Sequence, residues 1–229
     1  KIIVNYSHFK PNDQLGRTYD KIFINVESLS YLTGASTNLA TVSPENAFEA
    51  FRKLQTILDE AKIPLKVTEA LLCRVDLTLS MAVESPVNQY LPILRLIAPK
   101  GYRKTEYDGT NLTFIKNKAN AVSIYDKFEH LKSKKLKILE PLSQYGLEGK
   151  HCLRFEHQYR DSREIRKHLR IATVSDLINN AQRLERNFKI QFSEWIIPRS
   201  VPAALRVKAN NILVEHELLK ESGRSAPSF

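Results

Sequence analysis

Two segments of this 229-residue chain place acidic and basic side chains at alternating positions. Successive side chains of a β-strand point to opposite faces of the sheet, so residues two apart share a face. In CRVDLTL, Arg74 and Asp76 fall on one face and aliphatic residues on the other. In CLRFEH, Arg154 and Glu156 alternate with Leu153 and Phe155 in the same way.

A third segment, VSIYDK, has the same alternation and contains a tyrosine. Val122 and Ile124 are expected to face the core, whereas Tyr125 and Lys127 are expected on the opposite face. Each segment alone is typical of an ordinary amphipathic strand, in which a tyrosine is usually a packing residue. If the three strands belong to one sheet, their polar side chains can meet on a single face.

Carboxylates and arginines on one face are suited to phosphoryl transfer. Asp76 and Glu156 offer hard oxygen ligands for Mg²⁺ or Mn²⁺, and such a metal polarises a phosphodiester. Arg74 and Arg154 could each hold phosphate oxygens through paired N–H donors.

Tyr125 could act as a nucleophile that attacks phosphorus and forms a covalent ester. The ordinary pKa of a tyrosine is about 10, so its phenol needs activation near neutral pH. An ammonium group close by favours the phenolate, and so does a metal ion. Lys127, two residues further along the expected strand, is placed to supply that charge.

The chain is basic, with a formal net charge of +10 and an isoelectric point of about 9.5, and this favours a polyanion as partner. Two clusters of cations could neutralise phosphates and release counterions. Besides Arg74 and Arg154, the cations expected to bind DNA are Lys132, Lys134 and Lys135 in the first cluster and Arg160 and Arg163 in the second. A solvated helix face is the alternative reading of either cluster alone.

Other sequence features exclude several classes of protein. No apolar run approaches the roughly 20 residues that span a bilayer, and no secretory signal is apparent. No GxxxxGK[ST] phosphate loop or zinc-type cysteine pair occurs. Cys73 and Cys152 both lie in apolar runs, which indicates buried, reduced thiols and a cytoplasmic location.

The order of expected elements favours an α+β fold. Strands are expected at 1–5, 21–26, 71–83, 110–116, 121–126 and 151–160, with a turn at 12–17. Helices are expected at 44–58, 86–96, from 127 onward, and at 162–169, 174–187 and 203–221, before a polar tail at 223–229. The strands would form one antiparallel or mixed central sheet with helices mainly on one face. We divide the chain into an α+β domain at 1–170, which carries the candidate site, and a mostly helical C-terminal region at 171–229.

The three motifs, in this order, resemble the filamentous phage gene II replication initiators and the related rolling-circle plasmid initiators. The matching features are Arg74-Val75-Asp76, then Tyr125-Asp126-Lys127 with Glu129 after it, and last Arg154-Phe155-Glu156. The resemblance extends from about residue 20 to about residue 196 and includes the helix before the first motif. Each motif is weak alone, and their order and spacing make the match specific.

The resemblance implies a DNA nicking and rejoining enzyme of the bacterial host cytoplasm. Tyr125 would become linked to the 5′ phosphate, and the freed 3′ hydroxyl would prime rolling-circle replication. Asp76 and Glu156 would bind Mg²⁺ or Mn²⁺, with Glu129 as a third candidate ligand. The implied partner is single-stranded or supercoiled origin DNA, with a host helicase as a further candidate, and the oligomeric state stays open.

The expected metal site of this chain differs from that of many rolling-circle nucleases. Those enzymes bind the metal through a His-hydrophobe-His motif, and no His-x-His pair occurs in this sequence. His157 is expected in the core beside Phe155, while His130 and His151 are weaker candidates near the site.

A different class of function stays open beside the enzyme, namely a non-catalytic protein that binds single-stranded or origin DNA on the same fold. In that case Tyr102, Tyr107 and Phe114, which lie among basic residues, could stack on bases, although core packing is the expected role of Phe114.

Overall fold

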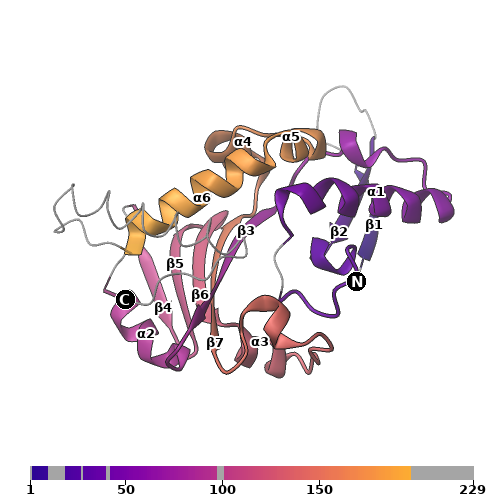
Figure 1. Cartoon of the computed structure of the whole chain (residues 1–229). Coiled ribbons are helices and arrows are strands. Elements are labelled where there is room, and N and C mark those ends of the chain that lie inside the picture. Colours follow the sequence, from indigo (N-terminus) through magenta and orange to yellow (C-terminus); the bar gives the residue numbers. More distant parts are fainter. Residues whose placement is uncertain (1, 10–18, 27, 40–41, 97–100, 197–229) are drawn as a thin grey trace.

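A computed structural model describes residues 2–9, 19–26, 28–39, 42–96 and 101–196 (Figure 1). The expected turn at 12–17, the helix at 203–221 and the tail at 223–229 lie outside these ranges. Within them, no helix has the length and apolar character needed to cross a bilayer.

A five-stranded antiparallel sheet forms the centre of the protein (Figure 1). Its strands, in the order in which they neighbour one another, are β3 (Val75–Val83), β7 (His151–Tyr159), β6 (Asn120–Asp126), β5 (Asn111–Asn117) and β4 (Lys104–Tyr107). The α+β prediction is therefore confirmed. Strand β4 was not expected from the sequence pattern, and the strand expected from residue 71 begins at Val75, because Leu71 forms only an isolated bridge with Thr173.

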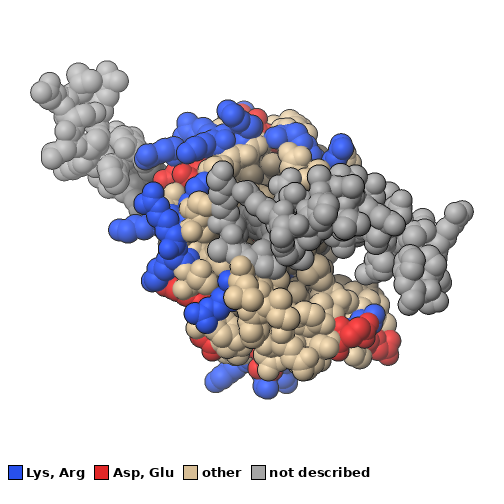
Figure 2. All heavy atoms as spheres, turned by 90° about the vertical axis from the view of Figure 1, so that its left-hand side faces the viewer, with Lys and Arg blue, Asp and Glu red and all other residues tan. Residues whose placement is uncertain are grey.

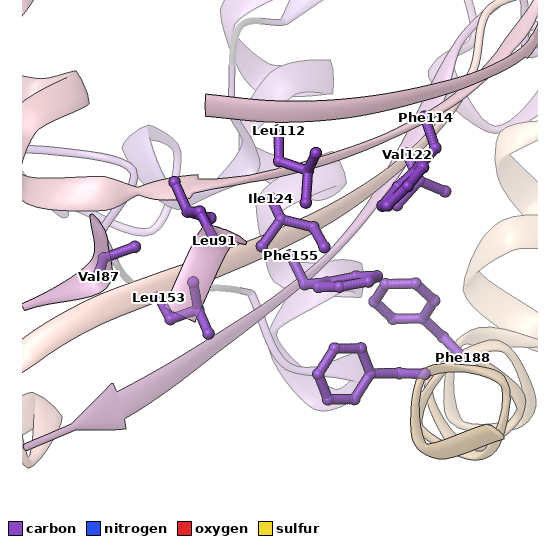
Figure 3. Close-up of a cluster of buried hydrophobic side chains, with 10 residues drawn as sticks. Val87, Leu91, Leu112, Phe114, Val122, Ile124, Leu153, Phe155 and Phe188 are labelled. Atoms are coloured by element: carbon purple, nitrogen blue, oxygen red, sulfur yellow. The ribbon is translucent and has the colours of Figure 1, made fainter. Parts of the chain in front are cut away.

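One face of the central sheet is apolar and covered by helices. In Figure 3, Phe155 of β7 and Phe188 point toward one another between the sheet and a helix. Phe188 belongs to α6 (Ala181–Ile196), and Leu91 of α2 (Val87–Leu94) packs in the same cluster. Helix α4 (Ser162–Leu169) adds Ile165 to a second cluster on this face. Each fully buried side chain of this size contributes about 1.5–3 kcal/mol through removal of apolar surface from water.

The helices after β7 differ from the single helix expected at 174–187. The structure contains α5 (Val174–Asn179) and then α6, with a break at Asn180. Asn180 donates its side-chain amide to the Asp176 carbonyl, while its own carbonyl accepts from the Leu184 N–H. Asn180 therefore ends one helix and begins the next, which suits a residue type that competes for local backbone bonds.

The N-terminal elements pack beside the sheet rather than within it. Strands β1 (Ile2–Phe9) and β2 (Tyr19–Val26) confirm the two expected strands and form a separate antiparallel pair. Helix α1 (Pro44–Glu60) begins as predicted, because the Ser43 hydroxyl accepts from the Asn46 N–H and Pro44 takes the first helical position. Short 3₁₀ turns occupy Leu29–Tyr31, Val67–Glu69 and Leu142–Tyr145.

The cysteine prediction is half right. Cys152 is buried, but Cys73 is exposed, because it precedes the first residue of β3 and therefore lies outside the packed part of the strand.

Candidate active site

The second face of the sheet, which helix α3 (Lys127–Ser133) and Leu39 cover at the end near Cys152, brings the three motifs together. Glu156 lies opposite Thr78 on β3 and opposite Ser123 on β6. Asp76 lies opposite Gln158, so Asp76 and Glu156 are diagonal neighbours on one face. Tyr125 lies opposite Arg154 and is a diagonal neighbour of Glu156 on the other side. The predicted shared face is therefore present in the structure.

Tyr125 lies at the wall of a groove of about 2140 Å³ that also contains Asp76 and Glu156. Its side chain is 8 % exposed, and none of the described residues forms a hydrogen bond with its hydroxyl. Burial, followed by the negative charge of Glu156, raises the pKa of Tyr125 above its ordinary value. The phenol is therefore protonated at neutral pH and needs a compensating positive charge to ionise.

The expected boundary between strand and helix is confirmed, but Lys127 does not lie on the strand face of Tyr125 as expected. β6 ends at Asp126, and Lys127 is the first residue of α3 (Lys127–Ser133). The Asp126 carboxylate accepts from the N–H groups of Phe128 and Glu129, which caps the helix and ends the strand. The side chain nevertheless lies beside the tyrosine, with Nζ 5.9 Å from the centre of the Tyr125 ring.

The Lys127 amine is completely buried, and its Nζ donates to Oδ1 of Asn38 at 2.7 Å. Burial, followed by the positive charge of Arg154, lowers the pKa of Lys127 to about 7. The charge on this group is therefore sensitive to pH in the physiological range, and any anion that enters the site stabilises the ammonium form.

Arg154 has a different role from the exposed phosphate contact that was expected. Its side chain is 3 % exposed, and Nη2 donates to the carbonyls of Asn38 at 2.8 Å and Leu39 at 2.7 Å. The guanidinium thus fixes the loop whose Asn38 side chain also holds Lys127. Its Nε has no hydrogen-bond partner among the described residues, and neither buried cation forms an ion pair with any of them.

The two strand carboxylates have different partners. Asp76 accepts from Arg74, with Nη2 to Oδ2 at 2.7 Å and Nε to Oδ1 at 3.0 Å. Glu156 accepts from Nε2 of Gln158 at 3.1 Å, and the Gln158 amide oxygen accepts from Arg160. Arg74 and Arg160 are therefore oriented toward the carboxylates of this face.

These carboxylates are suited to a divalent metal. Mg²⁺ in proteins commonly uses one or two carboxylates and completes its shell with water and phosphate oxygens. Asp76 and Glu156 meet that requirement as same-face neighbours at the wall of the groove. Among the described residues, no three His, Cys, Asp or Glu side chains gather into a metal-binding group.

Glu129, the third candidate ligand, lies on α3 and not on the sheet. Its side chain is 57 % exposed and pairs with Lys132 Nζ at 3.5 Å. Asp76 and Glu156 are therefore the better placed pair for a metal, and Glu129 lies further along the same groove wall.

The structure places one histidine against the tyrosine. The rings of His130 and Tyr125 lie 4.9 Å apart between centroids, because α3 turns back over the end of β6. A spacing of five residues across a strand–helix junction gives no regular pattern, so the sequence identified His130 only as a weak candidate.

The other two histidines considered from the sequence, His157 and His151, lie away from the tyrosine. His157 is in the core as expected, where it hydrogen-bonds with the Asn120 side chain and the Tyr159 hydroxyl. His151 begins β7 opposite Val83 and, by the alternation of the strand, lies on the same face as Leu153 and Phe155, opposite that of Tyr125.

The two basic clusters lie on different parts of the protein. Lys132, Lys134 and Lys135 are exposed on α3 and just after it, beside the groove. Arg160 bonds to Gln158 at the end of β7. Arg163 is exposed on α4, which covers the opposite face of the sheet.

The aromatic residues that could have stacked on bases are used elsewhere. Phe114 is 1 % exposed in the core, as expected. The Tyr102 hydroxyl donates to Asn120 Oδ1 at 3.0 Å in the buried network of His157. Arg95 lies over the Tyr107 ring. These contacts weaken the base-stacking alternative.

Comparison with known proteins agrees with this arrangement. The family model for the N-terminal part of the phage gene II replication-associated protein matches residues 36–180, which is more than half of the chain and includes all three motifs. No curated protein matches, and no solved structure matches either. The chain therefore belongs to the family of the N-terminal part of the phage gene II replication-associated protein, and it is a rolling-circle replication initiator whose partner is DNA.

Proposed function

We propose that this initiator nicks and rejoins DNA with Tyr125 as the nucleophile. The observation that best supports this proposal is that Tyr125 lies on the same face of the sheet as Asp76 and Glu156, and that all three line one groove. Tyr159, another buried tyrosine of the sheet, lies on the opposite face and has a hydrogen-bonded hydroxyl.

In the proposed step the Tyr125 oxygen forms a bond to phosphorus while the bond from phosphorus to the 3′ oxygen breaks. The phenol loses its proton, and the departing 3′ oxygen gains one. The products are a 5′ phosphotyrosine and a free 3′ hydroxyl. Because one phosphodiester replaces another, attack by the 3′ hydroxyl on the adduct rejoins the strand.

Buried positive charge next to Tyr125 supports this chemistry. Lys127 and Arg154 both lie beneath the end of the polar face without a carboxylate partner among the described residues. A buried cation without a counterion is costly, and a phosphate in the groove would offset that cost. The same charges stabilise the phenolate of Tyr125 and the additional charge of the transition state.

Asp76 and Glu156 would hold the Mg²⁺ or Mn²⁺ ion. When bound, the metal supplies Lewis acidity that polarises the phosphodiester. Before it binds, Asp76 is held by Arg74 and Glu156 by Gln158, which keeps both carboxylates turned toward the face. Arg74 then remains close to the entering phosphate as a donor.

Incubation of the protein with end-labelled single-stranded origin DNA and Mn²⁺, followed by a denaturing gel, tests this proposal. A labelled band at the mass of the protein plus DNA is expected, and peptide mapping should place the label on Tyr125. DNA binding without any covalent band or free 3′ hydroxyl would instead favour a non-catalytic origin-binding protein.

The cleavage rate is expected to depend on the charge of Lys127. Because its pKa is about 7, the ammonium form is lost as the pH rises, and kcat/KM should fall above about pH 7. The Asn38 Oδ1 atom lies 2.7 Å from the Lys127 Nζ atom, so Asn38→Asp places a negative charge beside the ammonium group and raises its pKa. The fall in kcat/KM should then occur about 1–3 pH units higher than in the unaltered protein.

A pH profile of single-turnover cleavage measures both effects. Asn88→Asp, an exposed change on α2, adds the same charge away from the site and should leave the profile unchanged. If the cleavage rate of the unaltered protein instead increases as the pH rises past 7, the Lys127 ammonium group is not required. That result would indicate that Lys127 acts as a proton acceptor.

A further inference from the structure

Helices α4 and α6 carry a basic surface on the side of the sheet opposite Tyr125. Ile165 of α4 and Leu184 of α6 pack against Val75 and Tyr159 on the covered face, so the outer sides of both helices point away from the sheet (Figure 1). The exposed cations there, called the α4–α6 basic surface below, are Arg163, Arg166, Lys167, Arg170, Arg183 and Arg186.

The carboxylates in the same stretch are already used by other groups. Asp161 and Asp176 accept backbone N–H groups at the starts of α4 and α5. Glu164 contacts Asn120 and His168 on the inner side of α4, and Glu185 pairs with Lys189. None of the six surface cations forms an ion pair with a described residue.

The charge continues onto the turn between β5 and β6. The Arg160 N–H donates to the Ala119 carbonyl, which fixes this turn next to the start of α4. Lys118 is exposed on the turn, and Lys116 lies close enough to His168 to influence its charge. Figure 2 shows Lys and Arg side chains along its upper margin, the side that α4, α5 and α6 occupy in Figure 1.

We propose that the α4–α6 basic surface binds the phosphate backbone of double-stranded DNA, as a second DNA contact separate from the groove of Tyr125. Unpaired cations on a helical surface neutralise phosphates and release counterions without reading sequence. Single-strand binders add aromatic rings that stack on bases, whereas the described aromatic side chains of α6, Phe188 and Phe192, are buried.

The location decides which DNA segment can bind here. The groove that Tyr125 lines extends to Ser162 of α4 and to Leu184 and Glu185 of α6, but none of the six surface cations lines it. A DNA segment bound to those cations is therefore not the strand that lies in the groove. The DNA segment that could bind the α4–α6 basic surface is the duplex that flanks the strand held in the groove of Tyr125. The proposal rests on DNA as the family's partner and does not require cleavage by Tyr125.

The test neutralises four of these cations together, as Arg163→Gln, Arg166→Gln, Lys167→Gln and Arg186→Gln. Binding to a fluorescent blunt duplex is measured across a salt series. Each lost phosphate contact lowers the slope of log K against log salt by about 0.9, so the loss of four contacts should make the slope smaller by about 3.6. Affinity for the duplex near 0.1 M salt should fall at least about tenfold.

A matched control carries Arg52→Gln, Lys53→Gln, Lys104→Gln and Lys150→Gln, which removes the same charge from exposed cations that are paired with carboxylates. Equal slopes of log K against log salt for the two variants would overturn the proposal. In that case the α4–α6 basic surface does not bind duplex DNA. Cleavage of a short single-stranded oligonucleotide should be the same in both, so a failure of tyrosine chemistry appears in that assay alone.

A second measurement on the unaltered protein avoids any folding defect of the fourfold variant. Bound duplex should protect Lys167 from acetylation by a small reagent, while exposed Lys53 on α1 stays reactive. Equal modification of Lys167 with and without duplex would also overturn the proposal.

Discussion

Tyr125→Phe is expected to abolish the covalent protein–DNA adduct and to lower the cleavage rate at least about a thousand-fold. The change removes only the attacking oxygen, because the ring and its packing against His130 remain. The hydroxyl forms no hydrogen bond with a described residue, so the free energy of unfolding should change by less than about 1 kcal/mol. A denaturing gel with labelled DNA and a thermal melt measure the two quantities.

Tyr159→Phe is the matched control for this variant. Tyr159 is also a buried tyrosine of the central sheet, but it lies on the covered face with its hydroxyl bonded to His157. Its loss should reduce stability by about 1 kcal/mol and leave adduct formation unchanged. Adduct formation by the Tyr125→Phe protein at the normal rate would remove Tyr125 from the mechanism.

Glu156→Gln is expected to lower the cleavage rate roughly a hundred-fold or more, because it removes a metal ligand and weakens stabilisation of the phosphodiester transition state. Charge alone has two opposed effects on the rate. The negative charge of Glu156 raises the pKa of Tyr125, so its loss should ease ionisation of the phenol, but the same charge also raises the pKa of Lys127 and favours the ammonium form. A measurement of metal binding is therefore needed beside the rate.

Binding of Mn²⁺, followed by electron paramagnetic resonance without DNA, provides a readout independent of cleavage. Glu156→Gln should weaken Mn²⁺ binding, whereas Glu84→Gln, at an exposed carboxylate beyond the end of β3, should not. Unchanged Mn²⁺ affinity in the Glu156→Gln protein would contradict the assigned ligand role.

Alternation along the chain predicted the shared polar face correctly because it is a local property. Side chains two apart in a strand share a face whatever the partner strand is, so Asp76, Tyr125 and Glu156 could be assigned before the strand order was known. The same rule placed His157 and Phe155 in the core, which the structure confirms.

The error at Lys127 was also local, and the sequence contained its signal. Asp126 followed three residues later by Glu129 is a helix-start pattern, and the Asp126 carboxylate does cap α3. The expected elements did end the strand at residue 126 and begin a helix at 127, as in the structure. Only the alternation argument extended the strand face to Lys127, and it still identified Tyr125 correctly as the neighbour of Lys127.

By itself, the sequence determined the α+β class, the face that carries the three motifs and the basic character that suits DNA. The tertiary structure alone decided that Asn38 holds Lys127, that the buried Arg154 binds the carbonyls of Asn38 and Leu39, and that Arg163 of the second basic cluster lies behind the sheet. Asn38 is far from both cations in the chain, and such contacts depend on how loops and helices pack across long sequence separations. Local periodicity carries no information about that packing, whereas it fully specifies which side chains of a strand share a face.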